Sequence, residues 1–304
     1  MDNLSKRLNR GEIIILDGAT GTELEKRGVP MDKSTWSAAA LQTHPDTVRN
    51  IHEDYIRAGA DIIITNTFGT AKHVLEPAGM VDQFVSLNKR AVTLAQQARS
   101  NVADRPIAIA GSISTFDALN DQNYRPSREQ AQANYREQAE TLAAAGVDLI
   151  MMEMMMDTEQ AVYAVKTAAS TGLPVWIGFS CAVDDNHKVL SFNRRYSFAS
   201  VLEAVLPLSG KVMSIMHTFT EDAEPSLEVL AEHWSGPVGI YTHSGRFIMP
   251  NWQFIDIISP QDYLSYAQRW VELGVQVIGG CCGTGPDHIR LLKAHLPSVN
   301  PARN

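Results

Sequence analysis

One short unit recurs along this chain and limits its fold more than any other feature: a helical stretch stops at a glycine, an acidic or polar residue follows, and a short apolar run begins. Three copies read Ala58-Gly59-Ala60-Asp61, Ala145-Gly146-Val147-Asp148 and Leu273-Gly274-Val275-Gln276. Glycine is common just past a helix end, because it adopts the left-handed conformation without a steric penalty. Strands that alternate with helices form right-handed βαβ units and therefore a parallel sheet.

The apolar runs predict eight strands, which begin near residues 13, 62, 107, 148, 175, 212, 238 and 276. Helical patterns cover residues 45–58, 82–100, 127–145, 157–171, 197–207, 223–234 and 260–273, and another helix starts near Asp287. Eight such units in 304 residues predict a (β/α)₈ TIM barrel of the α/β class, with residues 1–304 as one domain. The alternative is a doubly wound open sheet, but no dinucleotide glycine fingerprint follows the first strand.

Charge and cysteine content limit the partners and the location. The formal net charge is −8 and basic runs are lacking, which argues against nucleic acid and anionic membrane surfaces as partners. No run approaches 18 apolar residues, and residues 1–7 precede no signal-peptide-like stretch, so we expect no membrane span. Three cysteines do not make a disulfide framework, so we expect a cytoplasmic protein whose thiols bind metal or take part in catalysis. A homo-oligomer is compatible with this sequence.

Two further stretches are notable, one for its polar residues and one for its methionines. The polar segment 115–128 is predicted to be a long loop over one barrel mouth, and such loops often act as lids. The run Met151-Met152-Glu153-Met154-Met155-Met156 is predicted to give core packing and an adaptable pocket wall, because thioether is a weak metal ligand.

The most unusual stretch is Gly279-Gly280-Cys281-Cys282-Gly283-Thr284, which follows the last predicted strand. Adjacent cysteines do not easily form a disulfide with each other, but both can ligate one zinc ion if the chain turns between them. The alternative is a tight turn with two buried, inert thiols. Glycines on both sides favour the metal site, because they let the backbone approach an ion closely.

In a barrel of this kind the functional residues lie where the strands end. The polar residues predicted at that end are Asp17, Asn66, Thr67, Ser112, Glu153, Cys181, His217, His243, Cys281 and Cys282. Each has an ordinary structural explanation alone, but buried carboxylates are costly unless they are paired. Together the residues predict a zinc ion with an open position, which a thiol substrate would take as thiolate, and carboxylates that hold an ammonium group.

These residues resemble the homocysteine S-methyltransferase family, which includes the S-methylmethionine and betaine enzymes. The resemblance covers nearly the whole chain and includes Leu16-Asp17-Gly18-Ala19-Thr20-Gly21-Thr22-Glu23-Leu24, Trp36-Ser37-Ala38, Thr65-Asn66-Thr67-Phe68 and the closing glycine–cysteine motif. It implies a (β/α)₈ barrel with catalytic zinc. It also implies transfer of a methyl group from an onium donor to the thiolate of homocysteine, which gives methionine.

The resemblance also implies residue roles. Cys281 and Cys282 would be zinc ligands, Asp17 and Glu153 would bind the amino acid's ammonium group, and Gly18 and Thr67 would take its carboxylate. Asn66, beside Thr67, is assigned to the same substrate pocket.

The chain departs from the family at two places. The family's third zinc cysteine follows the sixth strand, where this chain has Ser214-Ile215-Met216-His217, so His217 is the expected third ligand. Imidazole in place of thiolate makes the ligand set less negative and the ion a stronger Lewis acid. Cys181 follows the fifth strand and is expected to be a bystander. His243, in Tyr241-Thr242-His243-Ser244-Gly245, is expected to line the pocket, with assistance to the leaving group as the alternative.

The methyl donor follows from what the sequence lacks. It has no glycine motif of an S-adenosylmethionine domain, and Thr70-Ala71-Lys72 occupies the place of the betaine enzymes' tyrosine. A sulfonium such as S-methylmethionine is therefore the expected donor. The alternative function is a divergent barrel whose altered metal site binds or hydrolyses another small amino-acid-like substrate; His217 motivates it.

Overall fold

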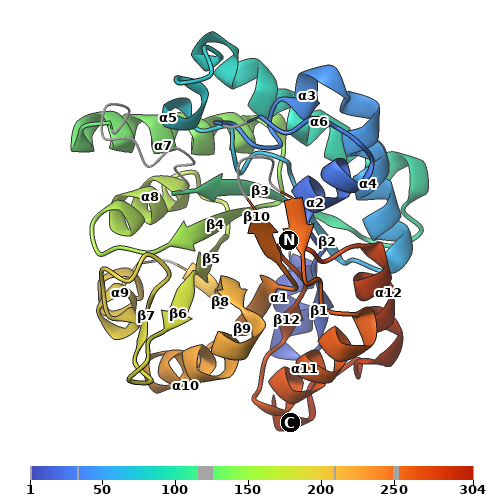
Figure 1. The fold of residues 1–304 in the computed structure, drawn as a ribbon, viewed down its shortest axis with the longest axis vertical. Helices are drawn as coiled ribbons and strands as arrows, with labels where there is room; N and C mark the ends of the chain where they lie inside the picture. The colour runs from blue at the N-terminus through green and yellow to red at the C-terminus, as the bar shows by residue number, and fades with distance from the viewer. Residues whose placement is uncertain (1, 33, 116–125, 209, 249–252, 304) are drawn as a thin grey trace.

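The computed structural model describes residues 2–32, 34–115, 126–208, 210–248 and 253–303, and it forms a ring of strands surrounded by helices (Figure 1). One eight-stranded sheet has the order β1-β12-β9-β8-β5-β4-β3-β2, and every neighbouring pair is parallel. Its strands are β1 (Ile14–Ile15), β2 (Ile62–Ile64), β3 (Ala108–Ser114), β4 (Leu149–Met155), β5 (Val175–Phe179), β8 (Gly210–Phe219), β9 (Val238–His243) and β12 (Val277–Ile278). A parallel bridge between Leu16 and Ile62 joins the two edges. The predicted α/β barrel with eight parallel strands is therefore confirmed.

Most helices cover the outside of the sheet, and together they include every helix that the sequence predicted. They are α1 (Asp2–Asn9), α2 (Thr20–Lys26), α3 (Ala40–Thr43), α4 (Pro45–Ala58), α5 (Lys72–Leu75), α6 (Phe84–Val102), α7 (Arg128–Ala145), α8 (Gln160–Ala169), α9 (Phe198–Val205), α10 (Ala223–His233), α11 (Pro260–Glu272) and α12 (Pro286–His295), with 3₁₀ turns at Val81–Gln83, Thr220–Asp222 and Pro301–Arg303. Gly59 and Gly146 end α4 and α7 with φ of 111° and 93°, the left-handed cap that the repeated unit predicts. No helix in the described ranges is long and apolar enough to cross a membrane.

The core has two layers because successive side chains of a strand point to opposite faces. One cluster lies between strands and helices, and the other fills the barrel interior. Within the methionine run, Met151 points into the interior while Met152 and Met155 pack in the outer layer, which confirms core packing there. At the N-terminal end of the strands, α1 inserts Leu8 into the interior cluster, and Gln276 donates a hydrogen bond to the Leu8 carbonyl. The opposite end remains for a functional site.

Two short antiparallel hairpins were not predicted. One pairs β6 (Cys181–Val183) with β7 (Val189–Ser191), and the other pairs β10 (Arg246–Ile248) with β11 (Gln253–Ile255). Both belong to loops that follow barrel strands, at the C-terminal end of the sheet. Of the predicted lid loop, residues 116–125 lie outside the described residues.

Candidate metal centre and substrate pocket

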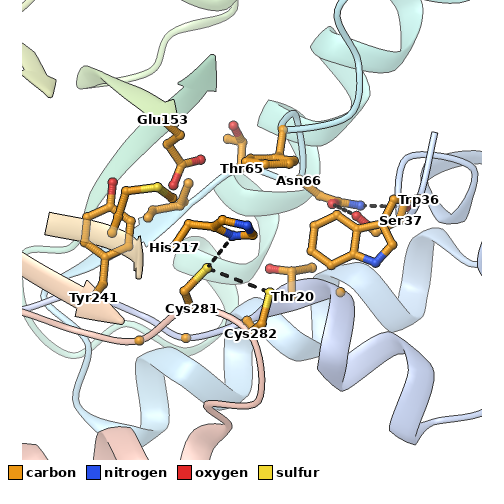
Figure 2. A pocket seen from close by; sticks show the side chains of 17 residues that line it. Thr20, Trp36, Ser37, Thr65, Asn66, Glu153, His217, Tyr241, Cys281 and Cys282 are labelled. Carbon is orange, nitrogen blue, oxygen red and sulfur yellow. Dashed lines mark hydrogen bonds between the residues drawn. The ribbon is translucent and has the colours of Figure 1, made fainter. Parts of the chain in front are cut away.

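Four donor residues meet at the C-terminal ends of three neighbouring strands. His217 belongs to β8, His243 ends β9, and Cys281 and Cys282 follow β12; their ligand atoms all lie within 4.8 Å of one another. Figure 2 shows the Cys281 Sγ atom between its neighbours, 3.9 Å from His217 Nδ1 and 3.9 Å from the Cys282 Sγ atom. Donors on one tetrahedral zinc ion are about 3.3–3.8 Å apart, given bond lengths of about 2.0–2.3 Å. The donor types and their spacing therefore fit a zinc ion with little movement.

Backbone contacts fix the turn that carries the two cysteines. Cys281 N–H donates to the Thr242 carbonyl at 2.9 Å, and Ser244 N–H donates to the Cys282 carbonyl at 2.8 Å, so the turn is joined to the end of β9. At Gly280 an added Cβ would lie 2.1 Å from the Thr284 side chain, and Gly283 has φ of 85°. Glycine is required at both places, as the sequence indicated, because the turn is too tight for a side chain.

His217 reaches the cluster through an irregular strand end. Its φ is 45°, and the register between β8 and β9 shifts between Met216 and Phe219. Such a bulge redirects a side chain, and a non-glycine residue at positive φ costs about 1–3 kcal/mol. Met154, next to Glu153, repeats the arrangement on β4 with φ of 57° and a shift between Met152 and Met155. Both irregularities turn a functional side chain toward the same mouth.

His243 lies deeper than His217 and packs against it, with ring centroids 4.1 Å apart. Its side chain is 2% exposed, and neither ring nitrogen has a hydrogen-bond partner among the described residues. Burial, with the nearby His217, lowers the pKa of His243 well below its usual value, so the ring is neutral. His243 does not line the main pocket but a second one, with Phe219, Glu221, Arg246 and Asp256 among its neighbours.

Cys181 is separate from this cluster. It lies on β6, fully buried, and burial raises the pKa of its thiol above the usual value. Its backbone N–H donates to Thr218 Oγ1 at 2.9 Å. Among the described residues it is not one of the grouped metal donors, which agrees with its expected role as a bystander.

His217, Cys281 and Cys282 of the donor group line a pocket at the C-terminal mouth of the barrel. Its walls come from the first strands, the last strands and the loops between them: Gly18, Ala19, Thr20, Gly21, Trp36, Ser37, Ile64, Thr65, Asn66, Phe68, Glu153, Met216, His217, Tyr241, Gly280, Cys281 and Cys282. Trp36 and Phe68 pack edge to face at 5.7 Å and form an aromatic wall that the sequence had not assigned, although both lie in the quoted motifs.

Two buried carboxylates belong to this region: Glu153 lines the pocket (Figure 2), and Asp17 lies behind the wall, next in the chain to the lining residue Gly18. Glu153 is 6% exposed and accepts a hydrogen bond from the Ser112 hydroxyl; burial raises its pKa to about 7. Asp17 accepts from Ile64 N–H through Oδ2, whereas its buried Oδ1 has no hydrogen-bond partner among the residues that the structure describes. Burial and the charge of Glu153 raise the pKa of Asp17 well above its usual value. In the described ranges neither carboxyl forms an ion pair, and burial favours the neutral form of both.

The remaining predicted substrate residues differ in their access to the pocket. Gly18 and Asn66 line it, and Asn66 is fixed by Ser37, which donates to its Oδ1 at 2.7 Å and accepts from its Nδ2 at 3.0 Å. Thr67 is fully buried behind the pocket wall, and its hydroxyl donates to the Ser112 carbonyl at 2.7 Å. The Thr67 hydroxyl therefore supports β3 at Ser112, the residue whose own hydroxyl contacts Glu153. Thr67 does not line the pocket.

Tyr55 on α4 holds the two halves of the mouth together. Its hydroxyl lies 3.1 Å from the Ala19 carbonyl and 3.0 Å from the Thr284 carbonyl, and it donates to these two turns. We expect Tyr55→Phe to lower the free energy of unfolding by about 1–3 kcal/mol, because a buried acceptor loses its donor. Urea denaturation measures this loss, with Tyr196→Phe on the exposed β7–α9 loop as control. Equal stability of the two variants would show that the Tyr55 hydroxyl does not hold these turns.

Three comparisons place the chain among known proteins. The family model described as homocysteine S-methyltransferase matches residues 14–296. Homocysteine S-methyltransferase of Escherichia coli (strain K12) is 31% identical, over 94% of this chain and 96% of that protein. Selenocysteine Se-methyltransferase of Brassica oleracea var. italica is 27% identical, over 95% of this chain and 90% of that protein. The metallated form of the homocysteine methyltransferase MmuM from Escherichia coli superposes with a TM-score of 0.79 at 27% identity, and covers 96% of this chain and 99% of that one. The chain is therefore an enzyme of the homocysteine S-methyltransferase family.

Proposed function

We propose that this enzyme transfers a methyl group from a sulfonium donor such as S-methylmethionine to the thiolate of homocysteine, with zinc as its metal. One observation supports this above all. Two thiols and an imidazole, from Cys281, Cys282 and His217, open onto the same pocket as the buried carboxyl of Glu153, and the buried carboxyl of Asp17 lies next to its wall. An α-amino thiol has the complementary groups: sulfur for the metal and ammonium for the carboxylates.

The metal would be held by His217, Cys281 and Cys282, which all line the pocket. Thiolate and imidazole are the ligands that zinc prefers, and bound zinc would lower the pKa of the substrate thiol. The protein's own residues would position the metal and the substrate. Cys281 and Cys282 keep a fixed position through their backbone bonds to β9. Two free thiols at the centre need a reducing compartment, for which the cytoplasm is our proposal.

The other end of the pocket would orient the amino acid. Asp17 and Glu153 would bind the ammonium group, and its arrival stabilises both in the charged state. We propose that Gly18 and Asn66 take the substrate carboxylate. Thr67 is also assigned to this group by the family motif, and its position behind the wall favours an indirect role through Ser112.

The transfer itself needs no proton donor. The thiolate sulfur attacks the methyl carbon in line, a new S–C bond forms, and the bond to the sulfonium sulfur breaks as a neutral thioether leaves. The thiolate anion and the sulfonium cation both lose their charge in this step. A pocket that excludes water therefore favours the reaction. Aromatic faces attract such cations, and the Trp36–Phe68 wall supplies them in this pocket.

A metal-dependent activity assay tests this function. Purified full chain with one equivalent of Zn²⁺, homocysteine and S-methylmethionine should form two methionines per turnover, and removal of the metal with a chelator should abolish the product. Betaine and S-adenosylmethionine serve as alternative donors, and selenocysteine as an alternative acceptor, since selenocysteine methyltransferases are among the relatives. Zinc-loaded protein that transfers no methyl group from any of these donors would favour the divergent barrel that binds or hydrolyses another amino-acid-like substrate.

A further inference from the structure

The two ring nitrogens of His243 are buried, and the described residues of the substrate pocket provide no hydrogen-bond partner for them. A neutral imidazole has one N–H donor and one acceptor nitrogen. In His243 both are buried, and neither has a partner in the described part of the chain. Leaving a buried polar group unpaired costs about 1–3 kcal/mol. The surrounding rings of Phe192, Phe219 and His217, with centroids 4.1–6.2 Å away, offer packing but no acceptor in place.

The position of His243 relative to the cysteines is tightly defined. Its neighbours in the chain, Thr242 and Ser244, exchange backbone hydrogen bonds with Cys281 and Cys282 respectively. The backbone carbonyl of His243 accepts from the Thr220 hydroxyl at 2.6 Å, which fixes the other side of the strand. A ring nitrogen of His243 consequently lies within 4.8 Å of the donor atoms of His217, Cys281 and Cys282.

We propose that His243 is a fourth protein ligand of the metal in the substrate-free enzyme. The proposal rests on the metal centre of the proposed function, but not on the identity of the methyl donor or acceptor. It gives a resting centre of two thiolates and two imidazoles, a closed tetrahedral set. The sequence had led us to expect three protein ligands and an open position. With four, an incoming thiol must replace a protein ligand or enlarge the coordination shell.

The second ring nitrogen of a ligating histidine normally donates to a nearby acceptor. His243 also lines the second pocket, which contains Glu221, Arg246 and Asp256. This polar pocket can hold a water molecule that accepts from the remaining N–H. The metal and that water would then satisfy both ring nitrogens.

Metal binding tests the proposal independently of activity. We expect His243→Phe, which fills the same space without a donor, to weaken Zn²⁺ binding at least tenfold in competition with a chelator. Substitution by Co²⁺ should show an altered ligand-field spectrum in this variant, because one nitrogen donor is lost. The matched control is His295→Gln, which removes an exposed imidazole at the end of α12 and should change neither measurement.

A second variant covers the case in which His243→Phe fails to fold, as judged by circular dichroism and thermal unfolding. His243→Cys keeps a ligating atom, so we expect tight Zn²⁺ binding and stronger thiolate-to-Co²⁺ charge-transfer absorption than in the wild type. Wild-type affinity and an unchanged Co²⁺ spectrum in either variant would overturn the proposal. Failure of the wild-type enzyme to methylate homocysteine would instead reject the proposed function, and the ligand result would be unaffected.

Discussion

His217→Ala is expected to release most of the bound metal and to reduce methyl transfer to a thiol by at least about 100-fold. The variant keeps Cys281, Cys282 and the buried His243, but it loses the imidazole that faces both the cluster and the substrate pocket. Removal of a residue that only orients a metal ligand typically lowers metal affinity or activity about 10- to 100-fold. Removal of a ligand itself should lower them by more. Metal content, measured by atomic emission, and methionine formation should decline together.

His217→Cys provides the matched comparison. It places a thiolate where the family has its third zinc cysteine, so we expect a full equivalent of zinc and methyl transfer at or above the wild-type rate. Cys181→Ala should change neither quantity, because that thiol lies outside the cluster. If His217→Ala kept full metal and full activity, His217 would be pocket filling and the third ligand would have to be reassigned.

Glu153→Gln is expected to raise the KM of the α-amino thiol by about 30- to 100-fold while the metal stays bound, because a charge-assisted contact to an ammonium group is worth about 2–3 kcal/mol. The pH profile should change as well. The pKa of Glu153 is about 7 in the free protein. Below that pH the carboxyl is neutral and binds the ammonium weakly, so KM of the wild type should fall as pH rises through 7. The glutamine variant should lose this part of the pH dependence.

The control for Glu153→Gln is Glu137→Gln, which removes a carboxylate that pairs with Lys72 away from the pocket. It should leave KM, its pH profile and the metal content unchanged. Loss of metal from Glu153→Gln with an unchanged KM would reverse the assigned roles, because Glu153 would then support the metal and not the substrate.

The barrel was predictable because its signals are local. Each repeat carries its own helix stop, as at Gly59 and Gly146, and an apolar run directly after it, so strand positions follow without knowledge of distant contacts. The cysteine pair was equally visible, because the glycines that its turn requires are adjacent in the sequence.

The parts that were missed depend on contacts between distant segments. The strained backbone at His217, which turns its ring toward His243, arises from a register shift between β8 and β9 and leaves no residue pattern. Thr67 was assigned to the substrate by its motif, whereas its hydroxyl points to the Ser112 carbonyl on the neighbouring strand. The two hairpins are three residues per strand, too short for an alternating pattern to stand out.

The place of β12 in the sheet has a consequence for biosynthesis. β12 lies between β1 and β9, and it is the last barrel strand to leave the ribosome. Until then β1 lacks this neighbour, and an open strand edge is prone to wrong pairing. The two cysteines follow β12 after two glycines, so the proposed metal site would also form last, after translation of the other seven strands. Metal uptake would thus stabilise only chains that have closed the ring, because binding energy at such a site is gained on folding. Scarcity of zinc in a growing cell would then first increase the share of newly made chains that proteases remove.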